Sequence, residues 1–187
     1  MSRNAGYSLI EAIFVVALVT FGSSAALVQL QSSVKAIDAD VASATVVSQM
    51  KYARQVAINS RYSVLVEFIS PATIRLTQFG AGGSSTVISN VTLPTGITFG
   101  LASGLGDTPE GYGNASAVHF NGATSGTFLA DGVFVNNAGI VVSGTVFTIG
   151  SGTGSARAVT LSGPNGRLKQ YYVRNNAWTE KRALGSL

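Results

Sequence analysis

The strongest constraint in this sequence is a long stretch near its N-terminus that carries almost no charge. Between Arg3 and Lys35 the one charged residue is Glu11, and residues 12–34 carry none. An uncharged run of this length is able to cross a hydrocarbon core of about 30 Å as a helix. Gly22-Ser-Ser interrupts the run, which makes the segment less hydrophobic than a permanent membrane anchor. We therefore expect a membrane-spanning segment that is able to leave the bilayer later.

The same stretch has a simpler interpretation, an ordinary secretory signal. Arg3 would be its charged region, residues 10–21 its apolar region, and Ser23-Ser24-Ala25 its cleavage site. The rest of the chain would then be a secreted, soluble β-domain. This interpretation leaves Glu11 unexplained, because a carboxylate in an apolar segment costs about 2.5–3.5 kcal/mol on insertion scales.

Gly6-Tyr-Ser-Leu-Ile-Glu11, with the apolar run behind it, resembles the N-terminal motif of type IV prepilins and type II secretion pseudopilins. The resemblance implies that a prepilin peptidase removes residues 1–6 by cutting after Gly6. Tyr7, where phenylalanine is commoner, then becomes the N-methylated first residue. Glu11 is implied in filament assembly, because its carboxylate would cost several kcal/mol if buried alone and the amine of Tyr7 on a neighbouring subunit can pair with it. A glycine before the cleaved bond also lets a protease approach the backbone closely.

The apolar pattern continues past residue 34 as an amphipathic helix. Apolar residues recur at spacings of three and four, which is typical of a helix face packed on a globular body: Val34, Ile37, Val41, Ala44 and Val47. We predict one helix over 7–60, with its first half in the membrane and its second half against the head. Lys51, Arg54 and Arg61 gather near its end, where positive charge offsets the helix dipole.

After residue 60 the apolar period changes to that of strands. Alternating segments bounded by turn residues predict strands at 62–69, 73–79, 86–93, 96–99, 117–120, 126–129, 140–142, 145–149, 157–161 and 168–173. The first two form a hairpin, and the turn-rich stretch 100–114 is expected to be an exposed connection. The predicted fold class is α+β, a long N-terminal helix packed on an antiparallel β-sheet head. Its parts are a leader at 1–6, the helix at 7–60 and the head at 61–187.

The sequence offers little for catalysis. It has no cysteine and a single histidine, His119, which excludes thiol chemistry and metal sites built on histidine clusters. Asp107, Glu110 and Asp131 are spread over loops, without a spacing typical of paired-carboxylate catalysis. The glycines at 150–154 lack the Gly-Lys-Ser/Thr of a phosphate loop and predict a hairpin loop. We predict that the protein is not an enzyme and has no catalytic residues, metal or cofactor.

Charge is unevenly distributed in the predicted head. Residues 76–156 contain three acidic residues and no Lys or Arg, whereas residues 157–187 contain six basic residues and one acidic residue. Tyr171, Tyr172 and Trp178 lie among these cations. Surfaces that bind nucleic acid combine cations for phosphates with aromatic rings for bases. The other interpretation is that the cations lie on an edge strand, where they prevent unwanted strand pairing.

The segments 118–122 and 155–169 resemble the C-terminal half of the H-type minor pseudopilin domain, which is GspH/FimT-like. FimT-like minor pilins of competent bacteria bind DNA through a Gly-Arg-x-Arg turn. Gly166-Arg-Leu-Lys169 is similar to it, although lysine lacks the bidentate fork of arginine. The resemblance makes Arg167, Lys169 and Arg174 candidate DNA-binding residues.

Together these observations predict a minor pseudopilin, a structural subunit of a periplasmic type II secretion pseudopilus involved in protein secretion. The resemblance implies a single-pass protein of the bacterial inner membrane, with a cytoplasmic N-terminus and a periplasmic head. Its implied partners are prepilin peptidase, other pilins or pseudopilins, and the inner membrane. The alternative is a FimT-like minor pilin of a type IV pilus that binds DNA in natural transformation.

Overall fold

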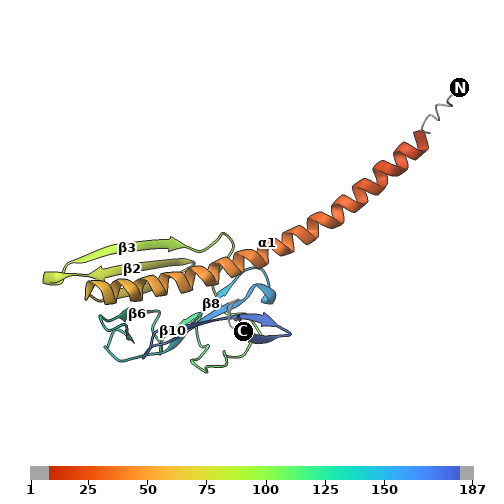
Figure 1. The fold of residues 1–187 in the computed structure, drawn as a ribbon. Helices are drawn as coiled ribbons and strands as arrows, with labels where there is room; N and C mark the ends of the chain where they lie inside the picture. The colour runs from red at the N-terminus through yellow and green to blue at the C-terminus, as the bar shows by residue number, and fades with distance from the viewer. Residues whose placement is uncertain (1–8, 182–187) are drawn as a thin grey trace, which may run out of the picture. The chain divides into compact units, whose positions relative to one another are not determined.

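The structure, a computed structural model, describes residues 9–181 and the side chains of all of these except 21–33. One helix, α1, covers Leu9–Ser60. The chain divides into two compact units, Met1–Lys35 and Ala36–Leu187, which are described separately below. The second unit, here called the head, contains the last part of α1 and the strands labelled in Figure 1.

In the first unit, α1 carries apolar side chains on all of its sides. The exposed large ones include Leu9, Ile10, Ile13, Phe14, Val15, Val16 and Leu18. Within the described residues, no helix combines the length and the apolar character that crossing a membrane requires. The predicted span, 12–34, includes residues 21–33, which lie outside the described side chains.

In the head, α1 packs through a strip of mostly small residues. The fully buried ones recur every three or four positions: Ala39, Ala42, Val46, Met50, Ala53 and Ala57. The contact face predicted from the sequence is wrong at four of its five residues, because Val34, Ile37, Val41 and Ala44 are exposed. The fifth, Val47, is half-buried and packs against the core. Alanines let the helix backbone approach the strands closely, so larger strand side chains fill the space between them at the density of a protein interior.

Two antiparallel sheets make up the rest of the head. Sheet A has the order β3-β2-β1-β6-β7, formed by β1 (Val64–Ile69), β2 (Thr73–Phe79), β3 (Ser85–Thr92), β6 (Ser125–Phe128) and β7 (Phe134–Val135). Sheet B has the order β11-β10-β9-β8-β4, with β5 paired to β8. It is formed by β4 (Thr98–Phe99), β5 (Val118–His119), β8 (Gly144–Ile149), β9 (Arg157–Ser162), β10 (Arg167–Arg174) and β11 (Ala177–Glu180). The predicted α+β class, with a helix packed on an antiparallel β-sheet head, is confirmed.

One hydrophobic core joins α1 to both sheets. The buried helix residues pack with Val64, Val66, Ile74 and Leu76 of sheet A and with Val146, Val159 and Leu161 of sheet B. Side chains alternate between the two faces of a strand. Ala158 and Tyr171 therefore lie on the outer face of sheet B, away from that core, where they form a second cluster with Phe147 and the partly buried Trp178.

The predicted strands differ from the structure mainly at the ends of the sheets. The strand predicted at 140–142 is wrong, because the Asn136 Oδ1 atom accepts hydrogen bonds from the backbone N–H groups of Ala138 and Ile140 at 3.0 Å each and closes a turn. Val141 makes an isolated bridge to Val135. The strands β7 and β11 were not predicted, since two and four residues are too few for a clear alternation.

Candidate functional site

The predicted processing site, Gly6 and Tyr7, lies outside the described residues. Glu11 lies in the first turn of α1 and is exposed. A carboxylate at this end of a helix interacts favourably with the helix dipole. Cleavage after Gly6, methylation of Tyr7 and the pairing of Glu11 stay predictions.

The basic residues of the C-terminal strands divide into those with carboxylate partners and those without. Arg157 is buried, and its Nε donates to the Asp40 Oδ1 atom on α1 at 2.6 Å. Its Nη1 also donates to the backbone carbonyls of Gly154 and Ala156 at 2.9 Å each. The Lys181 Nζ atom lies 3.0 Å from the other Asp40 oxygen. These two cations therefore fasten the helix to sheet B and are not available to a partner.

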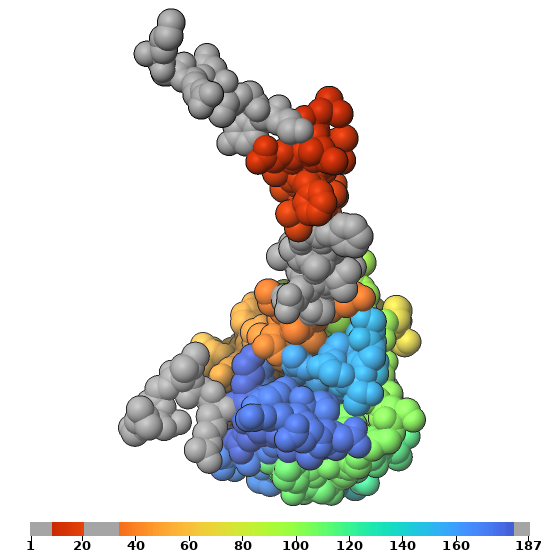
Figure 2. All heavy atoms as spheres, turned by 90° about the vertical axis from the view of Figure 1, so that its right-hand side faces the viewer, coloured from red at the N-terminus to blue at the C-terminus, as the bar shows by residue number. Residues whose placement is uncertain are grey.

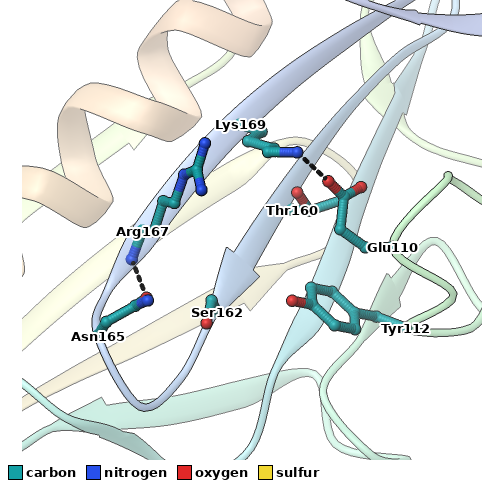
Figure 3. A pocket seen from close by; sticks show the side chains of 7 residues that line it. All are labelled: Glu110, Tyr112, Thr160, Ser162, Asn165, Arg167 and Lys169. Atoms are coloured by element: carbon teal, nitrogen blue, oxygen red, sulfur yellow. Dashed lines mark hydrogen bonds and ion pairs between the residues drawn. The ribbon is translucent and has the colours of Figure 1, made fainter.

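Lys169, a candidate DNA contact, is held by two carboxylates. Its Nζ lies 2.8 Å from the Oε1 atom of Glu110 and 3.4 Å from an oxygen of Glu180. The Tyr171 hydroxyl donates a short hydrogen bond to the same Glu110 oxygen. Glu110 lies in the connection 100–114, so this connection is tied to the outer face of sheet B (Figure 3). The expectation of an exposed connection is wrong at Thr108, which is buried, and at Glu110, whose side chain is only 14% exposed.

Charges and burial around Glu110 act in opposite directions on its pKa. Burial raises it, but hydrogen bonds from Lys169 and Tyr171 lower it more, so the pKa of Glu110 lies below its ordinary value of 4.5. The hydrogen bond to Glu110 raises the pKa of Lys169. Burial and the Glu110 carboxylate together raise the pKa of Tyr171 to about 12. The Glu110–Lys169 ion pair is therefore charged throughout the neutral pH range.

Arg167 and Arg174, at the two ends of β10, are exposed and have no carboxylate within ion-pair distance among the described residues. β9 pairs with Arg167–Tyr172 of β10, whereas β11 pairs only with Tyr171–Arg174. Among the described residues, Arg167 and Lys169 therefore have a neighbouring strand on one side alone, which agrees with the interpretation that these cations lie at a sheet edge. In Figure 2 the C-terminal strands, in blue, form part of the surface of the head, next to the green segment that precedes β5.

A polar cavity of about 170 Å³ lies beside Arg167 on the outer face of sheet B (Figure 3). Its lining comes from β9, from β10 and the turn before it, and from the connection 100–114: Thr160, Ser162, Asn165, Arg167, Lys169, Glu110 and Tyr112. The second oxygen of Glu110, Oε2, is buried and has no hydrogen-bond partner among the described residues. This cavity was not predicted from the sequence.

The remaining polar residues named in the sequence have local structural roles. Asp107 accepts hydrogen bonds from the backbone N–H groups of Thr108 and Gly113 at 2.7 Å each, and Asp131 accepts one from Val133 at 3.0 Å. His119 is half-buried on β5. Among the described residues, no group of three or more His, Asp or Glu side chains is placed to hold a metal ion.

Neither a protein-family model nor a curated protein sequence matches this chain. The solved structures that are similar to it include the following two. The type IV minor pilin FimU of Pseudomonas aeruginosa is 14% identical with a TM-score of 0.48, and the match covers 74% of this chain and 90% of that one. The minor pseudopilin EpsH from the Type 2 Secretion System of Vibrio cholerae is 15% identical with a TM-score of 0.48, covering 72% of this chain and 97% of that one.

Proposed function

We propose that this chain is a minor pseudopilin, a non-enzymatic subunit of a periplasmic filament that serves protein secretion. The observation that carries the proposal is the motif Gly6-Tyr-Ser-Leu-Ile-Glu11, whose residues Leu9 to Glu11 begin a helix that continues to Ser60. The apolar side chains on all sides of residues 9–18 support it, because such a surface needs lipid or neighbouring subunits to cover it. The chain is inserted in the inner membrane, cut after Gly6 and methylated on Tyr7 before assembly.

The processing step is tested by mass spectrometry of the protein extracted from membranes. We expect a mature chain that begins with methylated Tyr7. Gly6→Leu should block cleavage, because a bulky side chain keeps the protease from the backbone. Ala25→Leu is the matched control and should leave cleavage unchanged. A mature N-terminus near Ala26 that Ala25→Leu abolishes would overturn the proposal in favour of ordinary signal cleavage.

Glu11 is expected to act in assembly and not in membrane insertion. Glu11→Ala removes a charge from an apolar segment and should leave insertion intact. Crosslinking of the mutant to partner pseudopilins should fall sharply, since the Tyr7 amine of the neighbouring subunit loses its counter-charge. Asp38→Ala, which removes a carboxylate from a later turn of the same helix, is the control. Equal crosslinking by Glu11→Ala and the wild type would show that the pairing is dispensable.

A DNA-receptor pilin is the alternative function. Of the three candidate contacts, Arg167 and Arg174 are exposed and without a carboxylate partner among the described residues, which supports this alternative. Lys169 has two carboxylate partners, which weakens it. We therefore favour the structural subunit, and the salt dependence of DNA binding tests the alternative.

A further inference from the structure

The cavity beside Arg167 gathers polar groups that the fold itself does not use. The hydroxyl groups of Tyr112, Thr160 and Ser162 have no side-chain hydrogen bond among the described residues, and neither has the Arg167 guanidinium. These side chains come from separate segments and surround a common space (Figure 3). One lining atom, the Oε2 of Glu110, is buried and has no hydrogen-bond partner among the described residues. Buried polar groups in native proteins are nearly always hydrogen-bonded, so this cavity points to a polar ligand.

The lining side chains differ in exposure, which places some at the rim of the cavity and others at its floor. Arg167 is exposed, whereas Thr160 is only 2% exposed. Glu110 lies between these extremes, with a side chain that is 14% exposed and an Oε2 atom that is buried without a partner. A ligand that enters past Arg167 therefore meets a cation first and hydrogen-bonding groups beneath it.

The charges of the lining restrict the ligand. Arg167 is free to bind a carboxylate with its planar pair of N–H groups. The Glu110 Oε2 atom needs a hydrogen-bond donor, since an ionised carboxylate is an acceptor only. A cationic donor is disfavoured there, because the Lys169 Nζ lies 2.8 Å from the other oxygen of Glu110. A phosphate dianion is disfavoured as well, since it carries no donor and is repelled by Glu110. A neutral donor fits this position, and a hydroxyl group is such a donor.

We propose that this cavity binds a uronic acid unit, a sugar ring that carries one carboxylate and several hydroxyl groups. Arg167 takes the carboxylate, and Glu110, Thr160, Ser162 and Tyr112 take the ring hydroxyls. The volume of about 170 Å³ suits one ring, because pockets for larger, drug-sized ligands begin at about 300 Å³. The proposal does not depend on the assembly function.

The test is saturation-transfer NMR on the full chain with three probes: glucuronate, glucose and acetate. The detergent must be a polyoxyethylene type, because a maltoside carries sugar rings of its own. For a ligand of this size in a shallow site we expect a Kd for glucuronate on the order of 1 mM. Glucose lacks the carboxylate and acetate lacks the hydroxyls, so each should bind about tenfold more weakly or worse.

Two variants and one matched control assign the binding to this cavity. Arg167→Met should reduce glucuronate binding to the level of glucose. The double variant Tyr112→Phe with Ser162→Ala should weaken glucuronate binding about threefold or more and leave acetate binding unchanged. Arg174→Met removes an exposed cation at the other end of β10 and should have no effect.

Three results would overturn the proposal. The first is the absence of a glucuronate signal at about 20 mM, which is well above the expected Kd. The second is equal binding of acetate and glucuronate, which indicates a plain anion site, and the third is an equal loss of glucuronate binding in Arg167→Met and Arg174→Met, which indicates binding by general surface charge. The folding of each variant is checked by its thermal unfolding. The four side chains changed are exposed or half-buried, so the variants are expected to fold.

Discussion

Glu110 fastens the long connection between β4 and β5 to the outer face of sheet B. One of its carboxylate oxygens contacts both the Lys169 ammonium and the Tyr171 hydroxyl. Trp178 adds a second link, because its indole Nε1 donates to the Gly106 carbonyl at 2.8 Å. The connection thereby covers the apolar cluster of Phe147, Ala158 and Tyr171. A few polar contacts thus replace the strand pairing that this segment lacks.

Stability should depend on pH through Glu110. The pKa of Glu110 is depressed in the folded chain, so its contribution to stability is fully present above the ordinary pKa of 4.5 and is lost as pH falls through the folded value. Glu110→Gln should lower the free energy of unfolding at pH 7 by about 1–3 kcal/mol. Urea unfolding between pH 7 and pH 3 should show the two proteins converging at the acid end. A constant difference over this range would contradict the assignment.

For individual residues, the sequence predicted which side chains are exposed better than it predicted their ion-pair partners. Arg167 and Arg174 are exposed, as expected of candidate surface contacts. The partner of Lys169 could not be predicted, because Glu110 is 59 positions away, 169 − 110, in a stretch without secondary-structure signals. Such pairs depend on where a loop crosses a sheet, which local sequence does not encode. The cavity beside Arg167 depends on the same crossing and could not be predicted either.

Within the head, α1 is held to the sheets by polar contacts in addition to its buried strip. Asp40 contacts Arg157 on β9 and Lys181 just after β11. Gln49 accepts a hydrogen bond from Ser89 on β3 at 2.7 Å. Farther along the helix, the Arg54 Nε donates to the Gly132 carbonyl at 3.0 Å. The sequence predicted that Arg54 offsets the helix dipole, but its hydrogen bond links the helix to the turn between β6 and β7.

Asp40→Ala should loosen the docking of α1 on sheet B. The variant leaves the buried Arg157 guanidinium with backbone carbonyls as its hydrogen-bond partners. Because Asp40 is partly exposed, we expect the free energy of unfolding to fall by about 1–2 kcal/mol. Lys181→Ala, which removes the exposed partner of the same carboxylate, should cost about 0–1 kcal/mol. Chemical denaturation of the two variants measures the difference. Equal losses would show that Arg157 does not depend on Asp40.

Among the secondary-structure elements, the apolar period of the sequence predicted the helix and most strands. It did not predict which face of the helix packs on the sheets. The alternation at 62–69 and 73–79 predicted the β1–β2 hairpin, which pairs as expected. The helix face was wrong because hydrophobicity favoured valine and isoleucine over alanine. Ala39, Ala42, Ala53 and Ala57 are buried for their small size. The requirement for a close approach comes from the sheets, so the sequence of the helix alone does not indicate it.

For the whole molecule, the formal net charge of +4 does not indicate which cations are free to attract an anionic polymer. Arg157, Lys169 and Lys181 are all paired with carboxylates. Arg167 and Arg174 remain on the C-terminal strands without such a partner among the described residues. Nonspecific binding to duplex DNA depends on cations that contact phosphates.

Duplex DNA should therefore bind the full chain weakly and with a shallow salt dependence. Two phosphate contacts predict a slope of log K against log salt of about −1.8, so affinity should fall about tenfold between about 50 and 200 mM salt. Fluorescence anisotropy with labelled duplex measures this slope. Replacing Arg167 and Arg174 together by alanine should remove it, whereas Lys169→Ala should change it little. A slope steeper than about −4 would support a dedicated DNA receptor.

The way in which α1 is fastened to the head also determines how the molecule carries a mechanical load. The buried strip from Ala39 to Ala57 and the ties at Asp40, Gln49 and Arg54 are spread over several turns of the helix. A pull on the Ala36 end, along the helix axis, stresses these contacts together in shear. A pull across the axis strains Asp40 first and then each later contact in turn. The head should therefore resist a force along the helix much better than one that peels the helix away.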